Sequence, residues 1–244
     1  MHINTEQKPI LFLGFDGTIS KRDAIDLILE RFADESWRIV EELWKGGAIG
    51  SRECLRDQVA LIAAAPADIN NLLDEIKLDE GFAELLTVCR RHKIETCIVS
   101  DGFDYCIERI LSGTKFAQKL PVYSSHLEFR HGVWQTAFPH YGTFCEHDCA
   151  TCKPQVMKNL NPNNAPAIFV GDGLSDRYAA RAADLVFAKK GLANYCAAEN
   201  IKFAAYQNLG DVAGKLTEIL SAKKISPRPT APFFTTIETQ EIFG

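Results

Sequence analysis

The chain has 244 residues, of which 46% are hydrophobic, so it is long enough for a core domain with an inserted or second, smaller module. Its formal net charge of −5 and the lack of a long basic run argue against a nucleic-acid partner. No apolar run approaches the roughly 18 residues of a membrane span, and residues 1–6 lack the basic and apolar regions of a signal peptide, so we expect a cytoplasmic protein with no membrane partner.

The first predicted element is a buried strand at residues 10–13, which breaks into the turn Gly14-Phe15-Asp16-Gly17-Thr18. Apolar residues at three-to-four spacing then predict helices over residues 23–32, 36–44 and 51–64, and another from Pro66. Ser36 is a candidate N-cap for the second of these helices. This is too much helix for a simple crossover between strands, so we predict that residues 21–80 form a helical cap domain inserted after the first strand.

Helices and strands alternate through the rest of the chain. We predict a helix over residues 81–92, strands at 94–100, 167–170 and 185–188, a hairpin over 120–138, and helices from Lys153, after Asp176, around Asn194 and over 211–220. This order predicts an α/β fold with a Rossmann-like, doubly wound parallel sheet, in which residues 1–20 and 81–222 form the core domain and the hairpin is a small flap. The tail at 223–244 contains three prolines and two adjacent phenylalanines and could contact a partner; a homodimer is one candidate.

Carboxylates and hydroxyls follow several of these strands. Asp16 comes after the first strand, Ser100 ends the second, and Asp172 and Asp176 follow the strand at 167–170. Because ligands of open α/β sheets bind at the carboxyl ends of the strands, we expect these groups to meet there. Three carboxylates packed together repel one another unless a hard cation neutralises them, and Mg²⁺ suits such oxygen ligands.

A phosphate site is the second half of this prediction. Ser100 and the backbone amides near Gly102 could bind phosphate oxygens, and Lys153 would supply a fixed positive charge. Each feature alone has an ordinary explanation, because Asp-Gly and Gly-Asp-Gly are common turns, many strands end in serine and most lysines are solvated. Their order along the chain favours phosphoryl-transfer chemistry on a small phosphorylated metabolite.

Taken in order, four segments resemble the motifs of the haloacid dehalogenase superfamily of phosphatases: Asp16-Gly17-Thr18, Ser100-Asp101-Gly102, Lys153-Pro154 and residues 171–176. The helical insertion resembles the cap of the phosphoserine-phosphatase-like branch of that superfamily. Within the branch, the chain is similar to the methionine-salvage phosphatases and their relatives in Phe138-Pro139-His140, in the cysteines before Lys153 and in residues 184–188.

This resemblance implies a role for each motif residue. Asp16 would be the general acid and base, with its backbone carbonyl on Mg²⁺. Asp172 would ligate the metal directly, and Asp176 would be a ligand or a neighbour of one. The remaining residues would bind the phosphate group, and cap residues would select the substrate. The implied phosphate-binding residues are Thr18, Ser100, Asp101, Gly102 and Lys153.

Gly14 departs from the family pattern. The first motif of the family begins with an aspartate that attacks phosphorus and ligates the metal, and glycine can do neither. Asp16 is no simple substitute, because residues two apart on a strand lie roughly 6.6 Å apart. Three explanations stay open: an altered form of an active enzyme, a pseudophosphatase that binds a phosphorylated ligand without cleaving it, or slow direct hydrolysis by water that Asp16 activates. A dehalogenase is a weaker alternative, since that branch also needs the missing aspartate.

Three of the eight cysteines gather in one loop. The residues His140, Cys145, Cys149 and Cys152 are soft ligands whose spacing is compatible with a structural Zn²⁺ site that would pin the loop before Lys153. His147 is an alternative ligand to His140. The other interpretations are a disulfide, which the cytosol disfavours, or free thiols that shape a tight loop. The remaining five cysteines have apolar neighbours and are expected to be buried thiols.

Overall fold

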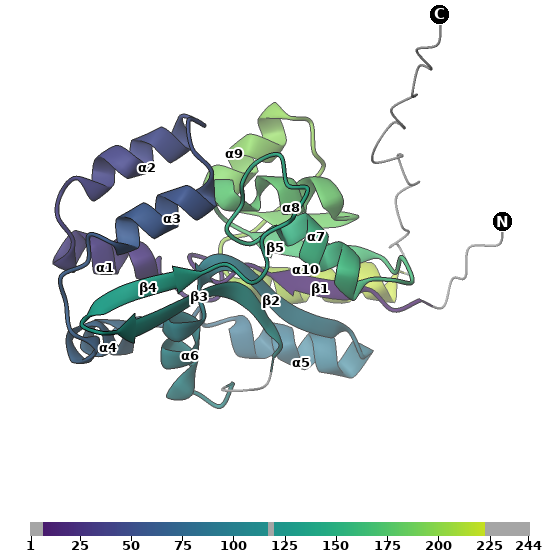
Figure 1. Cartoon of the computed structure of the whole chain (residues 1–244). Coiled ribbons are helices and arrows are strands. Elements are labelled where there is room, and N and C mark those ends of the chain that lie inside the picture. The colour runs from purple at the N-terminus through teal and green to yellow at the C-terminus, as the bar shows by residue number, and fades with distance from the viewer. Residues whose placement is uncertain (1–6, 117–119, 223–244) are drawn as a thin grey trace, which may run out of the picture.

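The computed structural model describes residues 7–116 and 120–222, and the predicted tail at 223–244 lies outside this range. A seven-stranded sheet runs through the described part of the chain in the order β4-β3-β2-β1-β5-β6-β7 (Figure 1). The strands are β1 (Ile10–Leu13), β2 (Glu95–Phe103), β3 (Val122–Arg130), β4 (Val133–Ala137), β5 (Ala167–Gly171), β6 (Leu185–Ala188) and β7 (Ala204–Ala205).

Helices cover both faces of this sheet. Between β1 and β2 lie α1 (Ala24–Phe32), α2 (Trp37–Lys45), α3 (Ser51–Val59), α4 (Pro66–Asp74) and α5 (Phe82–His92). The later helices are α6 (Asp104–Ser112), α7 (Lys153–Leu160), α8 (Arg177–Ala182), α9 (Lys190–Ala198) and α10 (Leu209–Ser221), with a short 3-10 helix at Leu174–Asp176.

β1 lies in the middle of the sheet. Leu13 is level with Ile98 of β2 and with Val170 of β5, and both pairings are parallel. Among the described strands, only the hairpin β3–β4 is antiparallel. The carboxyl ends of β1, β2 and β5 therefore meet at one edge of the sheet, and the predicted doubly wound α/β fold is confirmed.

Alternation along the strands divides the core into two layers. Leu11 and Leu13 of β1 pack in a cluster that includes side chains of α5, α6 and α10. Phe12 packs on the opposite face, in a cluster with side chains of α7, α8 and α9. Figure 1 shows this division, with α5 and α6 below the sheet and α7 and α8 above it. Burial on both faces explains why the central strands read as continuous apolar runs.

β2 continues past its predicted end at Ser100. It runs to Phe103, and its pairing with β3 shifts register between Val99 and Phe103. Ser100, Asp101 and Gly102 therefore lie in an irregular part of the strand, and not in a loop after it. The reason is tertiary, because the Ser125 hydroxyl of β3 donates to the Asp101 carbonyl at 2.9 Å. Such bulges often re-aim side chains beside active sites.

The predicted hairpin is confirmed, and its turn falls at His131 and Gly132, both with positive φ. It is not a separate flap, because β3 pairs in parallel with β2 and so extends the main sheet. Its second strand reaches the helical insertion: β4 packs against α3, and the Trp134 indole donates to the Ala64 carbonyl at 2.9 Å.

Helices α1 to α4 lie where the helical insertion was predicted, although their status as a separate cap domain stays a prediction. Ser36 does not cap α2 through its side chain. Its own backbone is helical, and its N–H donates to the Asp34 carboxylate at 2.9 Å, so that carboxylate occupies the capping position. A search of the described residues for a helix long and apolar enough to cross a membrane finds none.

Candidate active site

Asp16 lies in the turn that follows β1. The Gly14 N–H donates to the Val170 carbonyl at 2.9 Å, which holds the end of β1 against β5. The Asp16 carboxylate accepts a hydrogen bond of 3.0 Å from the N–H of Ala24, the first residue of α1. The turn therefore fixes this carboxylate between the sheet and the helical insertion.

Two glycines bring the predicted site residues close to Asp16. A Cβ on Gly102 would overlap the Asp16 carboxylate and lie 3.2 Å from the Ser100 hydroxyl, and the Gly102 N–H donates to that hydroxyl at 3.0 Å. Gly17, with φ of +66°, packs so closely on Asp172 that a Cβ there would overlap its carboxylate. The structure thus gathers Asp16, Ser100, Gly102 and Asp172, from three strand ends, around one point.

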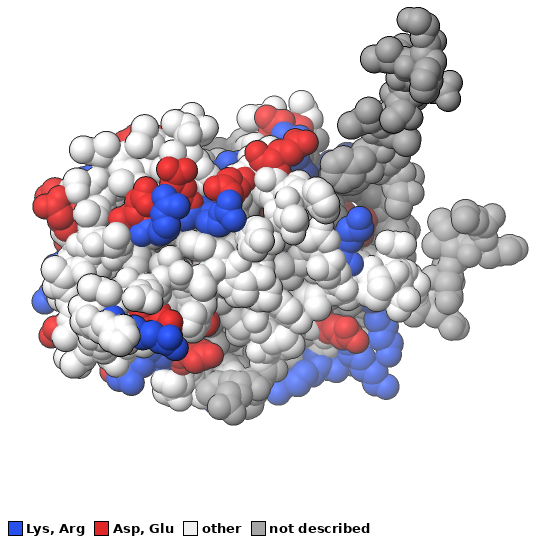
Figure 2. Space-filling model, in the orientation of Figure 1, with Lys and Arg blue, Asp and Glu red and all other residues white. Residues whose placement is uncertain are grey.

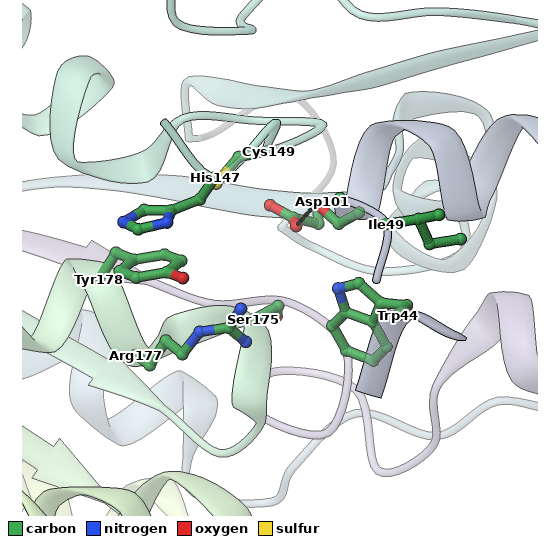
Figure 3. A pocket seen from close by; sticks show the side chains of 10 residues that line it. Trp44, Ile49, Asp101, His147, Cys149, Ser175, Arg177 and Tyr178 are labelled. Atoms are coloured by element: carbon green, nitrogen blue, oxygen red, sulfur yellow. Dashed lines mark hydrogen bonds between the residues drawn. The ribbon is translucent and has the colours of Figure 1, made fainter. Parts of the chain in front are cut away.

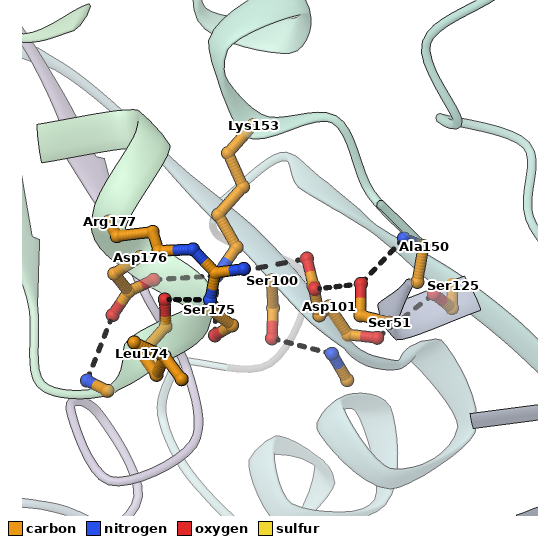
Figure 4. Close-up of polar contacts among 12 residues, drawn as sticks. Ser51, Ser100, Asp101, Ser125, Ala150, Lys153, Leu174, Ser175, Asp176 and Arg177 are labelled. Atoms are coloured by element: carbon orange, nitrogen blue, oxygen red, sulfur yellow. Dashed lines mark hydrogen bonds and ion pairs between the residues drawn. The ribbon is translucent and has the colours of Figure 1, made fainter. Parts of the chain in front are cut away.

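Lys153 joins this group from the first turn of α7. Its ammonium donates to Asp176 at 2.6 Å and to the Ser175 hydroxyl at 3.2 Å, and it lies 3.9 Å from the Asp101 carboxylate (Figure 4). Burial disfavours the charged ammonium, but the carboxylates of Asp176 and Asp101 outweigh it and raise the pKa of Lys153. The lysine is therefore a permanent positive charge inside the site.

Both oxygens of the Asp176 carboxylate have hydrogen-bond partners. One oxygen binds Lys153, and the other accepts from the N–H groups of Asp172 and Gly173 at 3.0 and 3.4 Å. Its contacts match the neighbouring role that the resemblance allowed, in which it orients the strand end that carries Asp172. The direct metal-ligand role of Asp176 stays a prediction.

Asp172 has a partner that sequence reasoning missed. The Lys190 ammonium lies 3.0 Å from its carboxylate, and the Asp172 side chain is 13% exposed. Burial and the charge of Asp176 raise the pKa of Asp172, whereas Lys190 opposes this. The sequence did contain a sign of this contact, because Lys190 lies two residues after the end of β6, at the same edge of the sheet.

The centre of the site is strongly acidic. Burial is the main reason that the pKa of Asp16 is raised to about 6. The hydrogen bond from the Ala24 N–H lowers this pKa, and the negative charge of Asp172 contributes to raising it. Asp23, the N-cap of α1, also has a pKa raised well above its ordinary value, by burial first and by Asp16 second. Buried carboxylates that repel one another in this way favour the uptake of a proton or a cation.

The residues do not form a complete metal site. Within residues 7–116 and 120–222, no group of three or more His, Cys, Asp or Glu side chains is arranged to hold a metal ion. For Mg²⁺ the donor chemistry is suitable, since Asp172 and the Asp16 carbonyl are hard oxygen ligands, but Asp176 is engaged elsewhere and Gly14 offers no carboxylate. The same search does not support the Zn²⁺ site predicted at His140, Cys145, Cys149 and Cys152, nor one with His147.

Position 14 has room for a side chain. A Cβ on Gly14 would lie 3.4 Å from the Thr18 hydroxyl and 3.5 Å from both the Asp176 carboxylate and the Val170 carbonyl, which is ordinary packing. The Thr18 hydroxyl is buried and lies near the Tyr206 hydroxyl. A carboxylate at position 14 could therefore be accommodated and would find a donor in Thr18.

Asp101, predicted to bind phosphate, is bonded to the helical insertion. Its carboxylate accepts from the hydroxyl of Ser51, the first residue of α3, at 2.8 Å, and that hydroxyl accepts from the Ala150 N–H at 2.9 Å (Figure 4). Ser51 thereby connects α3 to β2 and to the cysteine loop. No short motif marks this serine, so sequence reasoning missed it.

A pocket opens beside these residues, between the helical insertion and the start of α8 (Figure 3). The insertion contributes Trp44 and Ser51, and Arg177 lies across from them near Ser175. On another side, the His147 ring stacks on Tyr178 with centroids 3.9 Å apart. Aromatic, cationic and acidic side chains line this pocket. Acidic and basic side chains are mixed over the face shown in Figure 2.

Comparison with known proteins agrees with this arrangement. The family model described as haloacid dehalogenase-like hydrolase matches residues 11–181. The 2-hydroxy-3-keto-5-methylthiopentenyl-1-phosphate phosphatase of Bacillus pumilus (strain SAFR-032) is 27% identical over 92% of this chain and 98% of its own length. The protein of the same name from Bacillus cereus (strain G9842) is 27% identical over 87% of this chain and 98% of its own length.

Solved structures share the fold at lower identity. A phosphoserine phosphatase with a phospho-aspartyl intermediate analogue has a TM-score of 0.64 at 18% identity, covering 89% of this chain and 99% of that one. Cytosolic 5′-nucleotidase IIIB bound to cytidine has a TM-score of 0.58 at 14% identity, covering 88% and 86%. The predicted resemblance is confirmed by the family match, which spans most of the chain: this protein belongs to the haloacid dehalogenase-like hydrolase family.

Proposed function

We propose that this chain is a phosphomonoesterase of a small phosphorylated metabolite, in a form that Gly14 impairs, and that it acts in the cytoplasm. The observation that carries the proposal is the convergence of Asp16, Ser100, Asp172 and the buried Lys153 at the carboxyl ends of β1, β2 and β5. The names of the Bacillus relatives support a 1-phosphate such as 2-hydroxy-3-keto-5-methylthiopentenyl-1-phosphate as the substrate.

Different residues of the chain bind the phosphoryl group, transfer the proton and select the leaving group. Lys153, the Ser100 hydroxyl and the Gly102 N–H bind the oxygens of the phosphoryl group and oppose its negative charge. Asp16, with a pKa raised to about 6, exchanges a proton with the leaving oxygen near neutral pH. The insertion, through the pocket that Trp44 lines, selects the leaving group.

Gly14 removes the nucleophile and one metal ligand together. Mg²⁺, when bound, would neutralise charge on the phosphoryl oxygens. The described ligand set lacks a carboxylate at position 14. We therefore expect the chain as given to bind Mg²⁺ weakly and to hydrolyse its substrate slowly, although the other motif residues are present.

Restoring the carboxylate tests this proposal. Gly14→Asp should bind Mg²⁺ more tightly, measured by isothermal titration, and should raise Mg²⁺-dependent release of phosphate from a panel of phosphomonoesters by several orders of magnitude. Gly14→Ala fills the same space without a carboxylate and should stay as inactive as the parent. A panel on which Gly14→Asp gains no activity would overturn the proposed enzyme.

A pseudophosphatase is the second candidate, favoured by the loss of a single side chain from a site in which Lys153 and Asp176 stay paired. It predicts that phosphate esters bind tightly to both the parent and Gly14→Asp, with hydrolysis by neither.

Slow direct hydrolysis is the third candidate function, and the raised pKa of Asp16 favours it. It predicts weak activity in the parent that Asp16→Asn abolishes, with no covalent intermediate on rapid quenching.

A further inference from the structure

The loop between β4 and α7 gathers three thiols. The thiols of Cys149 and Cys152 and the backbone N–H groups of His147 and Cys149 lie close enough to Cys145 to influence the pKa of its thiol. All three cysteines are free, and Cys145 and Cys149 are partly exposed whereas Cys152 is buried. The proposed phosphatase chemistry uses none of them.

Gly142 allows two of these side chains to approach each other. A Cβ at position 142 would lie 2.9 Å from the Cys152 sulfur and 3.1 Å from the Cys145 Cβ, so both side chains occupy the space beside this glycine. The backbone holds them there, because the Cys145 N–H donates to the Gly142 carbonyl and the Cys152 N–H donates to the His140 carbonyl, each at 2.9 Å. Two cysteines held against the same turn can bond after a local shift of the turn and of the first residues of α7.

The three thiols differ in their tendency to react. Burial raises the pKa of the Cys145 thiol, but the hydrogen bonds to its sulfur outweigh burial, so its pKa is lowered. Burial raises the pKa of Cys152 to about 11 and that of Cys149 further. Cys145 is partly exposed and therefore open to a small oxidant, whereas Cys152 is buried and lies behind it as the second thiol.

We propose that Cys145 and Cys152 form a redox modification site, at which a peroxide closes a reversible disulfide beside the active-site lysine. The Cys145 thiolate attacks one peroxide oxygen, the O–O bond breaks, and the leaving hydroxide takes up the thiol proton as water. The Cys152 sulfur then displaces hydroxide from the resulting sulfenic acid, and its proton leaves as part of a second water. Two thiols are oxidised, one hydrogen peroxide is reduced, and a dithiol reductant reverses the reaction.

The site adjoins the phosphate-binding lysine. Cys152 is the N-cap residue of α7 and directly precedes Lys153, whose ammonium bonds Asp176 and Ser175. A bond from Cys152 to Cys145 draws the start of α7 toward the loop and away from the position that seats this ammonium. Oxidation therefore lowers the affinity of the chain for phosphate.

Peptide mapping tests the disulfide directly. The reduced full chain is treated with one equivalent of hydrogen peroxide, alkylated and cleaved after Glu146, which separates Cys145 from the other two cysteines. We expect the two fragments to stay joined, with a mass about 2 Da below their sum, and to separate after reduction with dithiothreitol. Isothermal titration with inorganic phosphate should show weaker binding by the oxidised chain and recovery on reduction.

Matched variants identify the pair. Cys145→Ser and Cys152→Ser should each prevent the link, Cys149→Ser should keep it, and Gly142→Ala should slow it by forcing the two side chains apart. A link that survives Cys152→Ser, or one zinc per chain in protein purified without chelator, overturns the proposal. Unchanged phosphate affinity after oxidation overturns the coupling to Lys153. If the reduced chain binds no phosphate, the proposed function is wrong. The peptide mapping then still tests the disulfide on its own.

Discussion

The ion pair between Lys153 and Asp176 is the most buried charged contact that the site contains, with side chains 4% and 5% exposed. Sequence reasoning singled out Lys153 because a lysine-proline pair precedes a helix, and it grouped Asp176 with the metal ligands because both aspartates follow one strand. It could not show that Asp176 bonds Lys153, because that depends on how α7 packs against α8 and β2. The same limit applies to Lys190 on Asp172 and to Ser51 on Asp101.

Breaking this pair should destabilise the protein strongly. Lys153→Met leaves the Asp176 carboxylate buried without its cation, and we expect the free energy of unfolding in urea to fall by about 3–5 kcal/mol. Arg181→Met is the control, because it removes one partner of the exposed ion pair with Glu199. It should change the free energy of unfolding by less than about 1 kcal/mol. Equal effects of the two substitutions would show that the Lys153 pair contributes no more than a surface contact.

At the scale of elements, the hydrophobic pattern located most of the described helices and strands, because buried helix faces repeat about every 3.6 residues and the central strands are continuous apolar runs. It misplaced the end of β2, where polar residues continue a strand that β3 holds from the side. It also missed β7, whose two residues are too few to show any period. Both errors occur where pairing with a distant strand, and not local preference, decides the structure.

A pH-dependent contact joins two of these elements. His126 of β3 lies 2.6 Å from the carboxylate of Asp104, the first residue of α6, and this hydrogen bond raises the pKa of His126. A raised pKa in the folded state means that the stabilisation is complete below about pH 6.5 and is lost as the pH rises through the raised value.

Urea unfolding across pH measures this contribution. The parent should be more stable than His126→Asn near about pH 6, and the difference should shrink toward about pH 9. The effect should be small, because the imidazole is partly exposed. Asp104→Asn should remove the same pH dependence, and its persistence in that variant would show that Asp104 is not the cause.

At the scale of the whole molecule, Asp79 connects three distant segments. Its carboxylate accepts from the N–H groups of Gly81, before α5, and Leu209, at the start of α10, both at 2.9 Å. Its own N–H donates to the Ile19 carbonyl in the turn after β1. The local sequence marks Asp79 only as a residue near a helix start, because its partner lies 130 residues away.

Asp79→Ala should therefore destabilise the whole fold. The side chain is 7% exposed, and its loss leaves two buried N–H groups unpaired, so we expect a fall of about 2–5 kcal/mol in the free energy of unfolding. Asp68→Ala, in the exposed first turn of α4, is the matched control. It should change the free energy of unfolding by less than about 1 kcal/mol. A small effect of Asp79→Ala would mean that water replaces the carboxylate at this junction.

The two ends of the sheet have a consequence for self-association. An open sheet normally presents unpaired backbone groups at its outer strands, and these can recruit strands from other molecules into aggregates. Here one outer strand, β7, is only two residues long, and the other, β4, is packed by α3 and anchored through Trp134. The helical insertion thus holds the outer strand β4 in place as well as facing the site, and we expect a chain without this insertion to be more prone to form intermolecular β-structure.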